Sequence, residues 1–300
     1  MKILLFGKNG QVGWELQRSL APLGELVALD TDSTELCGDF IDLEGIAGTV
    51  RSVAPDVIVN AAAHTAVDKA ESEPELARTI NALAPSILAQ EARRGDALMI
   101  HYSTDYVFDG SGMTPWRETD TTAPLNVYGS TKLEGEQRIY QSGCRHLVFR
   151  TSWVYGTRGG NFAKTMLRLA QERDSLSVIN DQIGAPTGAE LLADVTSHAI
   201  RVAQRKPGVS GLYHLVAGGE TSWHGYASFV LDFAHRSGTP LKVTAETIQA
   251  VPTSSFPTPA KRPHNSRMDT AKLQDTFKLT LPMWQNGVVR MLTEIMEKRL

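Results

Sequence analysis

Short apolar runs alternate with amphipathic stretches through the first half of this chain. Residues 3–6 are continuously apolar, and a second apolar run follows at 26–29. Between them, apolar residues recur at the spacing of one helix face, at Val12, Leu16 and Leu20. A continuous apolar run is typical of a strand buried on both faces, and the wider spacing is typical of a helix that covers it. This order of elements predicts parallel βαβ units.

The alternation continues to about residue 150 and then loosens. Further strands are expected at 56–60, 97–103 and 145–150, and a helix is expected at 74–93. Later in the chain, helices are expected at 161–173, 189–205 and 283–300, and strands at 176–179 and 213–216. Four prolines between residues 251 and 263 exclude a regular helix or an inner strand there.

Three glycines follow the first predicted strand, each three positions after the last. Glycine lets the backbone turn tightly and approach a pyrophosphate, and the helix that follows offers free N–H groups and the positive end of its dipole. An ordinary glycine-rich turn is the alternative, but the strand, loop and helix context favours a dinucleotide site. The loop residues assigned to the cofactor are Gly7, Asn9, Gly10, Gln11, Val12 and Gly13.

Residues near the end of the second strand are candidates for the adenosine half of a cofactor. Asp30 ends that strand, where its carboxylate can accept hydrogen bonds from a ribose. This arrangement would favour NADH over a 2′-phosphorylated cofactor, although Asp30 could instead cap the turn. Asp39 and Phe40 are expected to meet the adenine. The cofactor is therefore predicted to be NADPH or NADH.

These patterns predict an α/β protein with a doubly wound parallel sheet of the Rossmann type and a smaller, interleaved C-terminal substrate domain. Residues 1–150 are expected to form the dinucleotide-binding domain, to which segments at about 187–222 and 232–248 return. Residues 151–300 are expected to form mainly the substrate-binding region. A chain of 300 residues with 42% hydrophobic content can bury cores of this size.

Net charge and cysteine content limit the classes of partner and the cellular compartment that we expect for this chain. A net charge of −3 gives no basic field, so no nucleic-acid partner is expected. Cys37 and Cys144 form neither a CxxC pair nor a zinc pattern, which favours a reducing cytoplasm. No apolar stretch reaches the roughly 18 residues of a membrane helix, and the N-terminal apolar run is too short for a signal peptide. No membrane association is expected.

Tyr128 and Lys132 are the strongest candidates for chemistry. If their segment is helical, positions four apart share one face and the ammonium lies beside the phenol. A neighbouring cation lowers the pKa of a phenol from its ordinary value of about 10, which makes Tyr128 a candidate general acid. The pair alone is a weak signal, because this spacing also occurs on solvated helix faces.

Taken in order, these features resemble the extended branch of the short-chain dehydrogenase/reductase superfamily, which modifies nucleotide sugars. The segments that carry the resemblance are the glycine loop, residues 60–63, Asn81, residues 103–105, and the Tyr128 and Lys132 pair. Residues 101–110, 124–135, 150–156 and 181–187 are similar to the dTDP-4-dehydrorhamnose reductases in particular. The resemblance covers nearly the whole chain and weakens over the last predicted helix.

The resemblance implies hydride transfer from NADPH or NADH to the C4 ketone of a dTDP-sugar, dTDP-4-dehydro-β-L-rhamnose, to give dTDP-β-L-rhamnose. Tyr128 would donate the proton, Lys132 would lower the phenol pKa and hold the nicotinamide ribose, and Thr104 would tune the tyrosine. The residues implied to contact the sugar are Thr104, Asp105 and Trp153, and those implied to line the cofactor are Ala63, His64, Thr65 and Tyr102. Trp153 could instead be plain core, and His64 could be structural.

The resemblance also implies a homodimer with Mg²⁺ between the subunits, held by carboxylates placed like Glu15 and Glu190. Each carboxylate could instead be a surface charge of a helix. A substrate diphosphate needs local cations, for which Lys261, Arg262 and Arg267 are candidates, although such loop charges are usually solvated.

Two other functions remain open. One is another nucleotide-sugar reductase, or an epimerase that retains its NAD and returns the hydride to the same substrate. The other is a non-catalytic, nucleotide-binding regulatory subunit, since a fold alone does not settle function. The complete set of Thr104, Tyr128 and Lys132 favours an enzyme.

Overall fold

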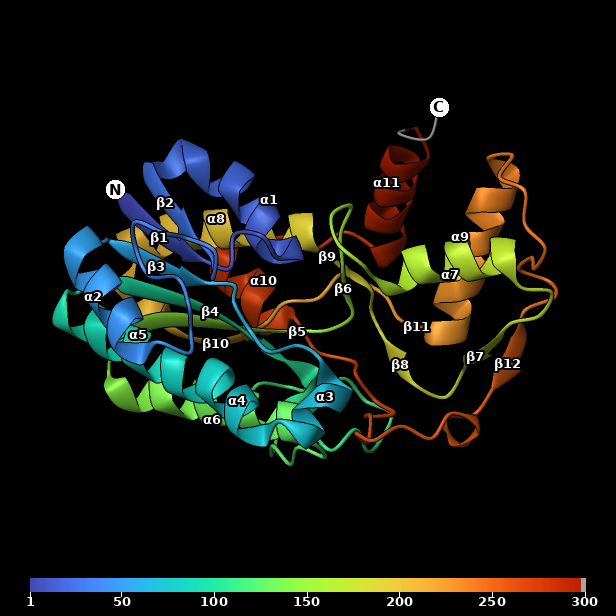
Figure 1. The fold of residues 1–300 in the computed structure, drawn as a ribbon, viewed down its shortest axis with the longest axis horizontal. Helices are drawn as coiled ribbons and strands as arrows, with labels where there is room; N and C mark the ends of the chain where they lie inside the picture. The colour runs from blue at the N-terminus through green and yellow to red at the C-terminus, as the bar shows by residue number, and fades with distance from the viewer. Residues whose placement is uncertain (298–300) are drawn as a thin grey trace.

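Six parallel strands form the central sheet of the computed structural model, which describes residues 1–297 (Figure 1). In spatial order they are β2 (Glu25–Leu29), β1 (Lys2–Phe6), β3 (Val57–Asn60), β4 (Leu98–Thr104), β5 (Arg145–Thr151) and β10 (Gly211–His214). The order of strands along the chain reverses between β1 and β3. In an open α/β sheet the crevice at such a point, outside the carboxyl ends of the strands, is where ligands bind.

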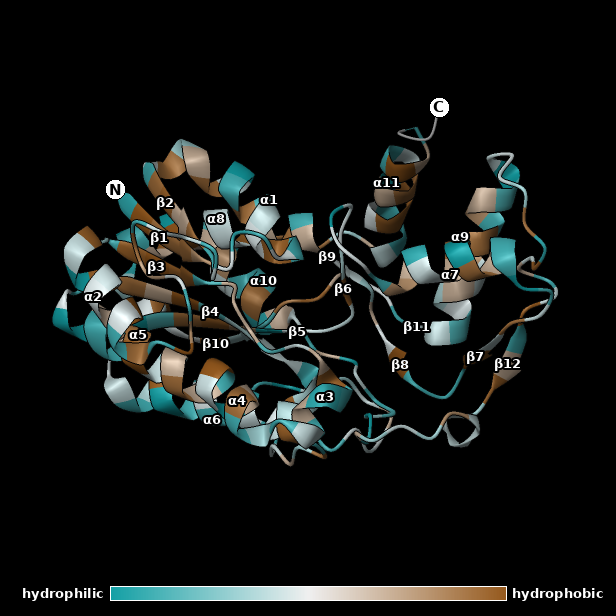
Figure 2. Cartoon of the chain, viewed as in Figure 1, coloured by the Kyte–Doolittle hydropathy of each residue, from teal (hydrophilic) through white to brown (hydrophobic). Residues whose placement is uncertain are grey.

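The apolar runs become strands because helices cover both faces of the sheet. Along β1, Ile3 and Leu5 point to one face while Leu4 and Phe6 point to the other, and all four are fully buried. The first face is covered by α1 (Gln11–Leu20), α8 (Ala189–Arg205) and α10 (Ala271–Phe277), and the second by α2 (Leu43–Val53), α5 (Ala84–Arg94) and α6 (Val127–Ser142). Figure 2 shows apolar strands between helices of mixed character. The predicted doubly wound fold is confirmed.

The helix expected at 74–93 is interrupted. After α3 (Val67–Ser72), helix α4 (Pro74–Arg78) leads into a π-helical turn, η2 (Thr79–Leu83), and then into α5. Pro85 has no N–H, so the carbonyl of Asn81 cannot receive an α-helical bond four residues on. That carbonyl lies against Gly135 of α6, where an added Cβ would be 2.3 Å from it.

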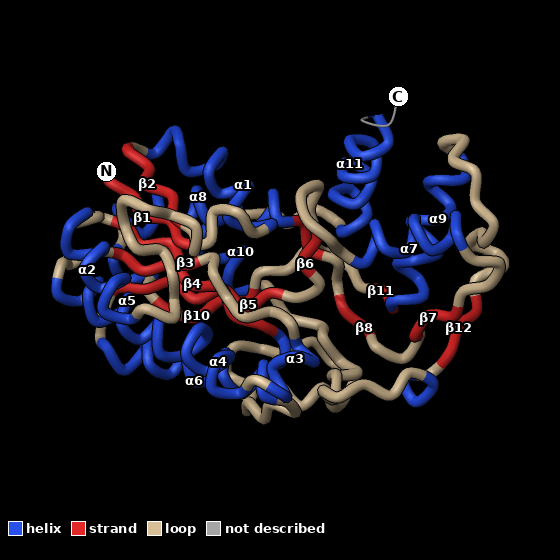
Figure 3. Tube along the Cα trace, viewed as in Figure 1, coloured by secondary structure: helices blue, strands red, loops and turns tan. Residues whose placement is uncertain are grey.

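A second, smaller core contains α7 (Phe162–Glu172), α9 (Trp223–Arg236) and α11 (Trp284–Glu297), at the right of Figure 1. Short strand pairs and long loops accompany these helices (Figure 3). The pairs are β6 (Val154–Tyr155) with β9 (Thr187–Gly188), β7 (Ser177–Ile179) with β12 (Gln249–Val251), and β8 (Ile183–Gly184) with β11 (Thr221–Ser222).

Packing places two segments differently from expectation. Residues 232–248 were expected to return to the first sheet, but Val243 and Ile248 pack into the second core beside α7 and α9. Helix α10 lies in the part assigned to the substrate region, yet Leu273 and Phe277 pack under the central sheet. Of the helix expected at 283–300, residues 298–300 lie outside the described part.

Within residues 1–297, no helix has the length and apolarity needed to cross a bilayer.

Candidate active site

The glycine loop lies where the strand order reverses, with its backbone pressed against the segment after β3. Gly7 has φ +84°, and a Cβ on it would be 2.7 Å from the Ala62 nitrogen. A Cβ on Gly13 would be 1.9 Å from the Gly7 carbonyl oxygen, so only glycine lets α1 start this close to β1. Gly10 is the N-cap of α1, and no side chain caps this helix. The loop therefore fits a pyrophosphate: its backbone can be approached closely and its helix start is open.

The residues expected near adenosine have distinct positions. The Asp30 carboxylate accepts hydrogen bonds from the N–H groups of Asn9, at 2.9 Å, and Thr31, at 2.8 Å, so it braces the glycine loop. The Asp39 carboxylate accepts from the Ile41 N–H. The Phe40 ring is buried edge-on against Phe6, with centroids 5.4 Å apart. The ring is thus part of the core beside β1, and the expected contact of Asp39 and Phe40 with adenine stays a prediction.

A cavity of about 460 Å³ lies over the carboxyl ends of the central strands and brings most of the predicted residues together. The predicted residues that line it are Gly10, Gln11, Val12, Ala63, Thr65, Tyr102, Thr104, Asp105, Tyr128, Lys132 and Trp153. His64 does not line it. Its Nε2 atom lies 3.7 Å from the Glu73 carboxylate, and its backbone N–H donates to the side chain of Asn81. The His64 side chain thus lies beside Glu73, and its expected contact with the cofactor stays a prediction.

Tyr128 and Lys132 lie one turn apart near the start of α6, whose N-cap is Asn126. Lys132 is buried, and its Nζ donates to the Tyr102 carbonyl at 2.5 Å and lies 3.2 Å from His101 Nε2. Burial lowers the pKa of Lys132 to about 8, although Glu136 acts in the opposite direction.

The phenol of Tyr128 differs from expectation. Burial raises its pKa to about 12, although the Thr104 hydroxyl acts to lower it. The lysine amine is directed toward His101 and the Tyr102 carbonyl, and its expected effect on the phenol pKa stays a prediction. A phenol with a raised pKa keeps its proton at neutral pH, so Tyr128 is still able to act as a general acid.

Thr104 and Asp105 form a buried hydrogen-bonded pair at the end of β4. The Thr104 hydroxyl donates to Asp105 Oδ1 at 3.0 Å and accepts from the Tyr106 N–H at 3.1 Å. Burial raises the pKa of Asp105 to about 6, against the opposing effects of the Ser266 and Thr104 hydroxyls. The pair therefore places a hydroxyl and a weakly acidic carboxyl beside Tyr128.

Two indoles form one wall of the cavity. Trp153 has φ +49°, an unusual backbone conformation for a bulky side chain, and its ring stacks on that of Trp223 with centroids 3.7 Å apart. Trp223 was not predicted, and neither was Tyr106, whose ring meets that of Tyr128 edge-on at 5.6 Å. The backbone of Trp153 is strained where strain often accompanies function. The stacked pair of indoles supports the interpretation that Trp153 forms a wall against a sugar or a base, rather than a plain core residue.

The charged candidates outside the cavity already have partners. Arg262 bonds Asp68 at 2.7 Å and Arg267 bonds Glu220 at 2.6 Å, and neither lines the cavity. The two predicted magnesium ligands are also in ion pairs, Glu15 with Arg18 and Glu190 with Arg290. Across residues 1–297, no group of three or more His, Cys, Asp or Glu side chains is arranged to hold a metal. The magnesium site stays a prediction.

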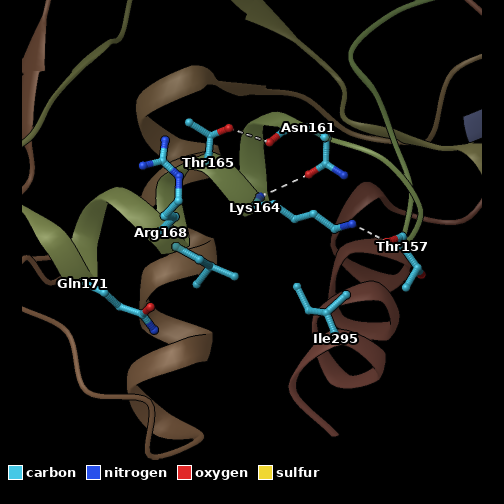
Figure 4. Close-up of a pocket in the computed structure, with 9 residues that line it drawn as sticks. Thr157, Asn161, Lys164, Thr165, Arg168, Gln171 and Ile295 are labelled. Carbon is cyan, nitrogen blue, oxygen red and sulfur yellow. Dashed lines mark hydrogen bonds between the residues drawn. The ribbon is translucent and has the colours of Figure 1, made fainter. Parts of the chain in front are cut away.

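A second cavity, of about 520 Å³, lies between α7 and α11 (Figure 4). Its two cationic side chains are engaged. Lys164 donates to the carbonyls of Thr157 and Gly159, and Arg168 pairs with Glu172. Although it is larger, it contains neither the glycine loop nor Tyr128, and we assign the active site to the 460 Å³ cavity.

The doubly wound sheet, the glycine loop at its reversal point and the Tyr-Lys pair facing the same cavity define a dinucleotide-dependent oxidoreductase of the extended short-chain dehydrogenase/reductase type. Residues 1–297 match the model of the family described as RmlD substrate binding domain, and the chain belongs to this family. It is 64% identical over 295 residues to a dTDP-4-dehydrorhamnose reductase of Shigella flexneri, which covers 98% of each chain.

Solved structures agree with this membership. A dTDP-4-dehydrorhamnose reductase of Clostridium acetobutylicum superposes with a TM-score of 0.89 at 34% identity, covering 99% of this chain and 100% of that one. One from Bacillus anthracis, in complex with NADP, has a TM-score of 0.88 at 33% identity, covering 98% and 99%.

Proposed function

We propose that this chain is an NAD(P)H-dependent reductase that converts the C4 ketone of dTDP-4-dehydro-β-L-rhamnose to the alcohol of dTDP-β-L-rhamnose. The observation that carries the proposal is one cavity lined by both the glycine loop and Tyr128. Similarity over almost the full length to proteins named for this reaction supports the choice of substrate.

The reaction is ketone plus NAD(P)H plus a proton, giving alcohol and NAD(P)⁺. The cofactor supplies a hydride to C4, and the residues of the chain position the reactants and manage the proton. Tyr128 donates its phenolic proton to the carbonyl oxygen as negative charge builds there. Thr104 would hydrogen-bond the phenol, and Lys132 lines the same cavity. The paired indoles of Trp153 and Trp223 form a wall that excludes water on one side.

The cofactor would lie along the reversal point of the sheet. Gly7, Gly10 and Gly13 would receive its pyrophosphate at the open start of α1, and Asp30 would lie near the adenosine ribose. The Asp30 carboxylate is held by two backbone N–H groups, which leaves it acceptor capacity for a ribose hydroxyl.

We also infer a cytoplasmic homodimer. The two cysteines, Cys37 and Cys144, are free thiols, which fits a reducing compartment. The half-exposed Trp14 indole with the Arg158 guanidinium over its ring offers an aromatic and cationic surface of the kind found at interfaces. Magnesium between Glu15 and Glu190 of two copies belongs to the same proposal.

The test is the Tyr128→Phe variant, compared with wild type and with Tyr140→Phe, which changes an exposed tyrosine on the same helix. We expect Tyr128→Phe to lose roughly 10²- to 10⁴-fold in kcat with NADPH affinity nearly unchanged, and Tyr140→Phe to behave as wild type. Turnover is followed by the loss of reduced-nicotinamide absorbance, and the sugar product is identified by NMR. Undiminished turnover in Tyr128→Phe would remove its role as proton donor. Tightly retained NAD without net consumption of NADPH would point to an epimerase.

A further inference from the structure

The amide of Asn60 has only one orientation that its neighbours allow. The Ala62 N–H donates to Asn60 Oδ1 at 3.0 Å, which fixes the oxygen on that side. The amide nitrogen, Nδ2, then faces His101 Nδ1 at 3.0 Å. Both side chains are buried, and the pairing of β3 with β4 sets residues 60 and 101 directly opposite each other. Because an amide nitrogen can only donate, His101 Nδ1 must accept.

The other ring nitrogen of His101 must then carry the proton. A neutral imidazole has one donor and one acceptor, and burial lowers the pKa of His101 well below its usual range, with Lys132 acting in the same direction. The Nε2–H group therefore faces Lys132 Nζ at 3.2 Å. An ammonium at Lys132 would set one N–H against another, or it would move the histidine proton to Nδ1, against the Asn60 amide. The uncharged amine accepts from His101 and donates to the Tyr102 carbonyl without conflict.

We infer that His101, held by Asn60 as its Nε2–H tautomer, is a positioning residue that donates to Lys132 and favours the uncharged amine of that lysine. The consequence is a lysine that exchanges its proton in the pH range where the reaction runs. Any activity that needs the Lys132 ammonium is then lost as the pH rises through the pKa of that lysine.

The other charged groups around Lys132 do not replace this effect. Glu136 on the same helix acts to raise the lysine pKa, but it is paired with Arg150 of β5 at 2.6 Å. From η3 (Asp105–Val107), Asp105 faces Thr104 and Tyr128, and from α4 the Arg78 side chain pairs with Glu134 on the outer part of α6. His101 is the group that contacts the amine itself.

The tautomer can be measured in the free protein without substrate. Wild-type protein labelled with ¹⁵N-histidine is recorded by long-range ¹H–¹⁵N NMR, and the His101 signals are assigned by their loss in His101→Phe. We expect a proton on Nε2 and none on Nδ1 near neutral pH. A proton on Nδ1, or on both nitrogens, would overturn the inference.

The kinetic consequence rests on the proposed function and is tested separately. Two variants test the coupling: His101→Phe removes the donor to Lys132, and Asn60→Asp reverses the tautomer of His101. In each variant we expect the alkaline limb of the kcat profile to move up by about one pH unit, which is a tenfold change in the proton affinity of Lys132. His146→Phe changes a histidine outside the cavity and should leave the alkaline limb in place.

If the alkaline limb stays or moves down in a variant that circular dichroism shows to be folded, the coupling is refuted. If one variant does not fold, the other and the wild-type tautomer still decide. An inactive wild type with the Nε2–H tautomer would count against the proposed function alone.

Discussion

Asp105 is a buried carboxyl whose ionisation should reduce stability at neutral pH. Its pKa is raised by burial from 3.8 to about 6, and it is 2% exposed. A carboxyl whose pKa rises on folding stabilises the folded chain below its unfolded pKa, and this contribution is lost as the pH rises through the folded value. Asparagine has the same shape and still accepts from the Thr104 hydroxyl, but it carries no charge. We therefore predict that Asp105→Asn gains stability relative to wild type as the pH rises from 4 to 7.5.

The size of the effect follows from the pKa shift. A difference of about two pKa units, at about 1.4 kcal/mol each, is about 3 kcal/mol when the group is fully ionised. Some of this difference is already present at pH 4, so the change between pH 4 and 7.5 should be about 2.5 kcal/mol. Asp68, Glu91 and Glu134 have lowered pKa values because of arginine partners, and they act with the opposite sign. These groups are present in both proteins and cancel in the comparison.

The assay is urea unfolding of wild type and Asp105→Asn at several pH values between 4 and 7.5. Asp109→Asn is the control, because that exposed carboxylate accepts from the Ser111 N–H and its pKa is lowered. The difference in unfolding free energy between Asp109→Asn and wild type should be small. As the pH rises, this variant should lose rather than gain stability relative to wild type. A difference between wild type and Asp105→Asn that does not change with pH would refute the reasoning, since the carboxyl would then have the same pKa folded and unfolded.

Three further predictions concern the glycine loop, the indole wall and the subunit interface. Gly13→Ala should weaken NADPH binding at least tenfold by fluorescence, because its Cβ would lie 1.9 Å from the Gly7 oxygen. The control is Gly48→Ala, whose Cβ would meet nothing within 4 Å: it should stabilise the protein by about 0.5–1 kcal/mol and bind NADPH normally. Equal NADPH affinities in the two variants would contradict the steric argument. Trp223→Ala should raise KM roughly tenfold with little change in kcat, and a loss confined to kcat would place the indole at the reacting centre instead. In sedimentation experiments, EDTA and the Glu190→Gln substitution should each weaken the dimer. A dimer unchanged by both would contradict a metal that holds the two subunits together.

Local signals were enough for the fold and for the position of the glycine loop between a strand and a helix. The glycines lie directly after a buried strand, and the close approach of Gly13 to the Gly7 carbonyl involves residues only six positions apart. The contact of Gly7 with Ala61 and Ala62, by contrast, forms only when β1 and β3 pair. Side chains that meet across the sheet could not be predicted in this way. The spacing of Tyr128 and Lys132 gave a shared helix face, but the direction of the lysine depends on His101, which becomes its neighbour only through tertiary packing. The stack on Trp153 likewise depends on a residue 70 positions later, Trp223.

The interrupted helix shows how a local irregularity positions the site. The signal was present in Pro85, which cannot donate to the Asn81 carbonyl, and the π-helical turn follows from it. The side chain of Asn81 then bonds both the N–H and the carbonyl of His64, at 2.8 and 3.1 Å, and donates to Thr131 of α6 at 3.2 Å. One residue thus ties the cavity-lining loop after β3 to the helix that carries Tyr128. An unbroken helix would place this amide elsewhere, so the irregular turn is what holds the loop after β3 and the helix of Tyr128 in register.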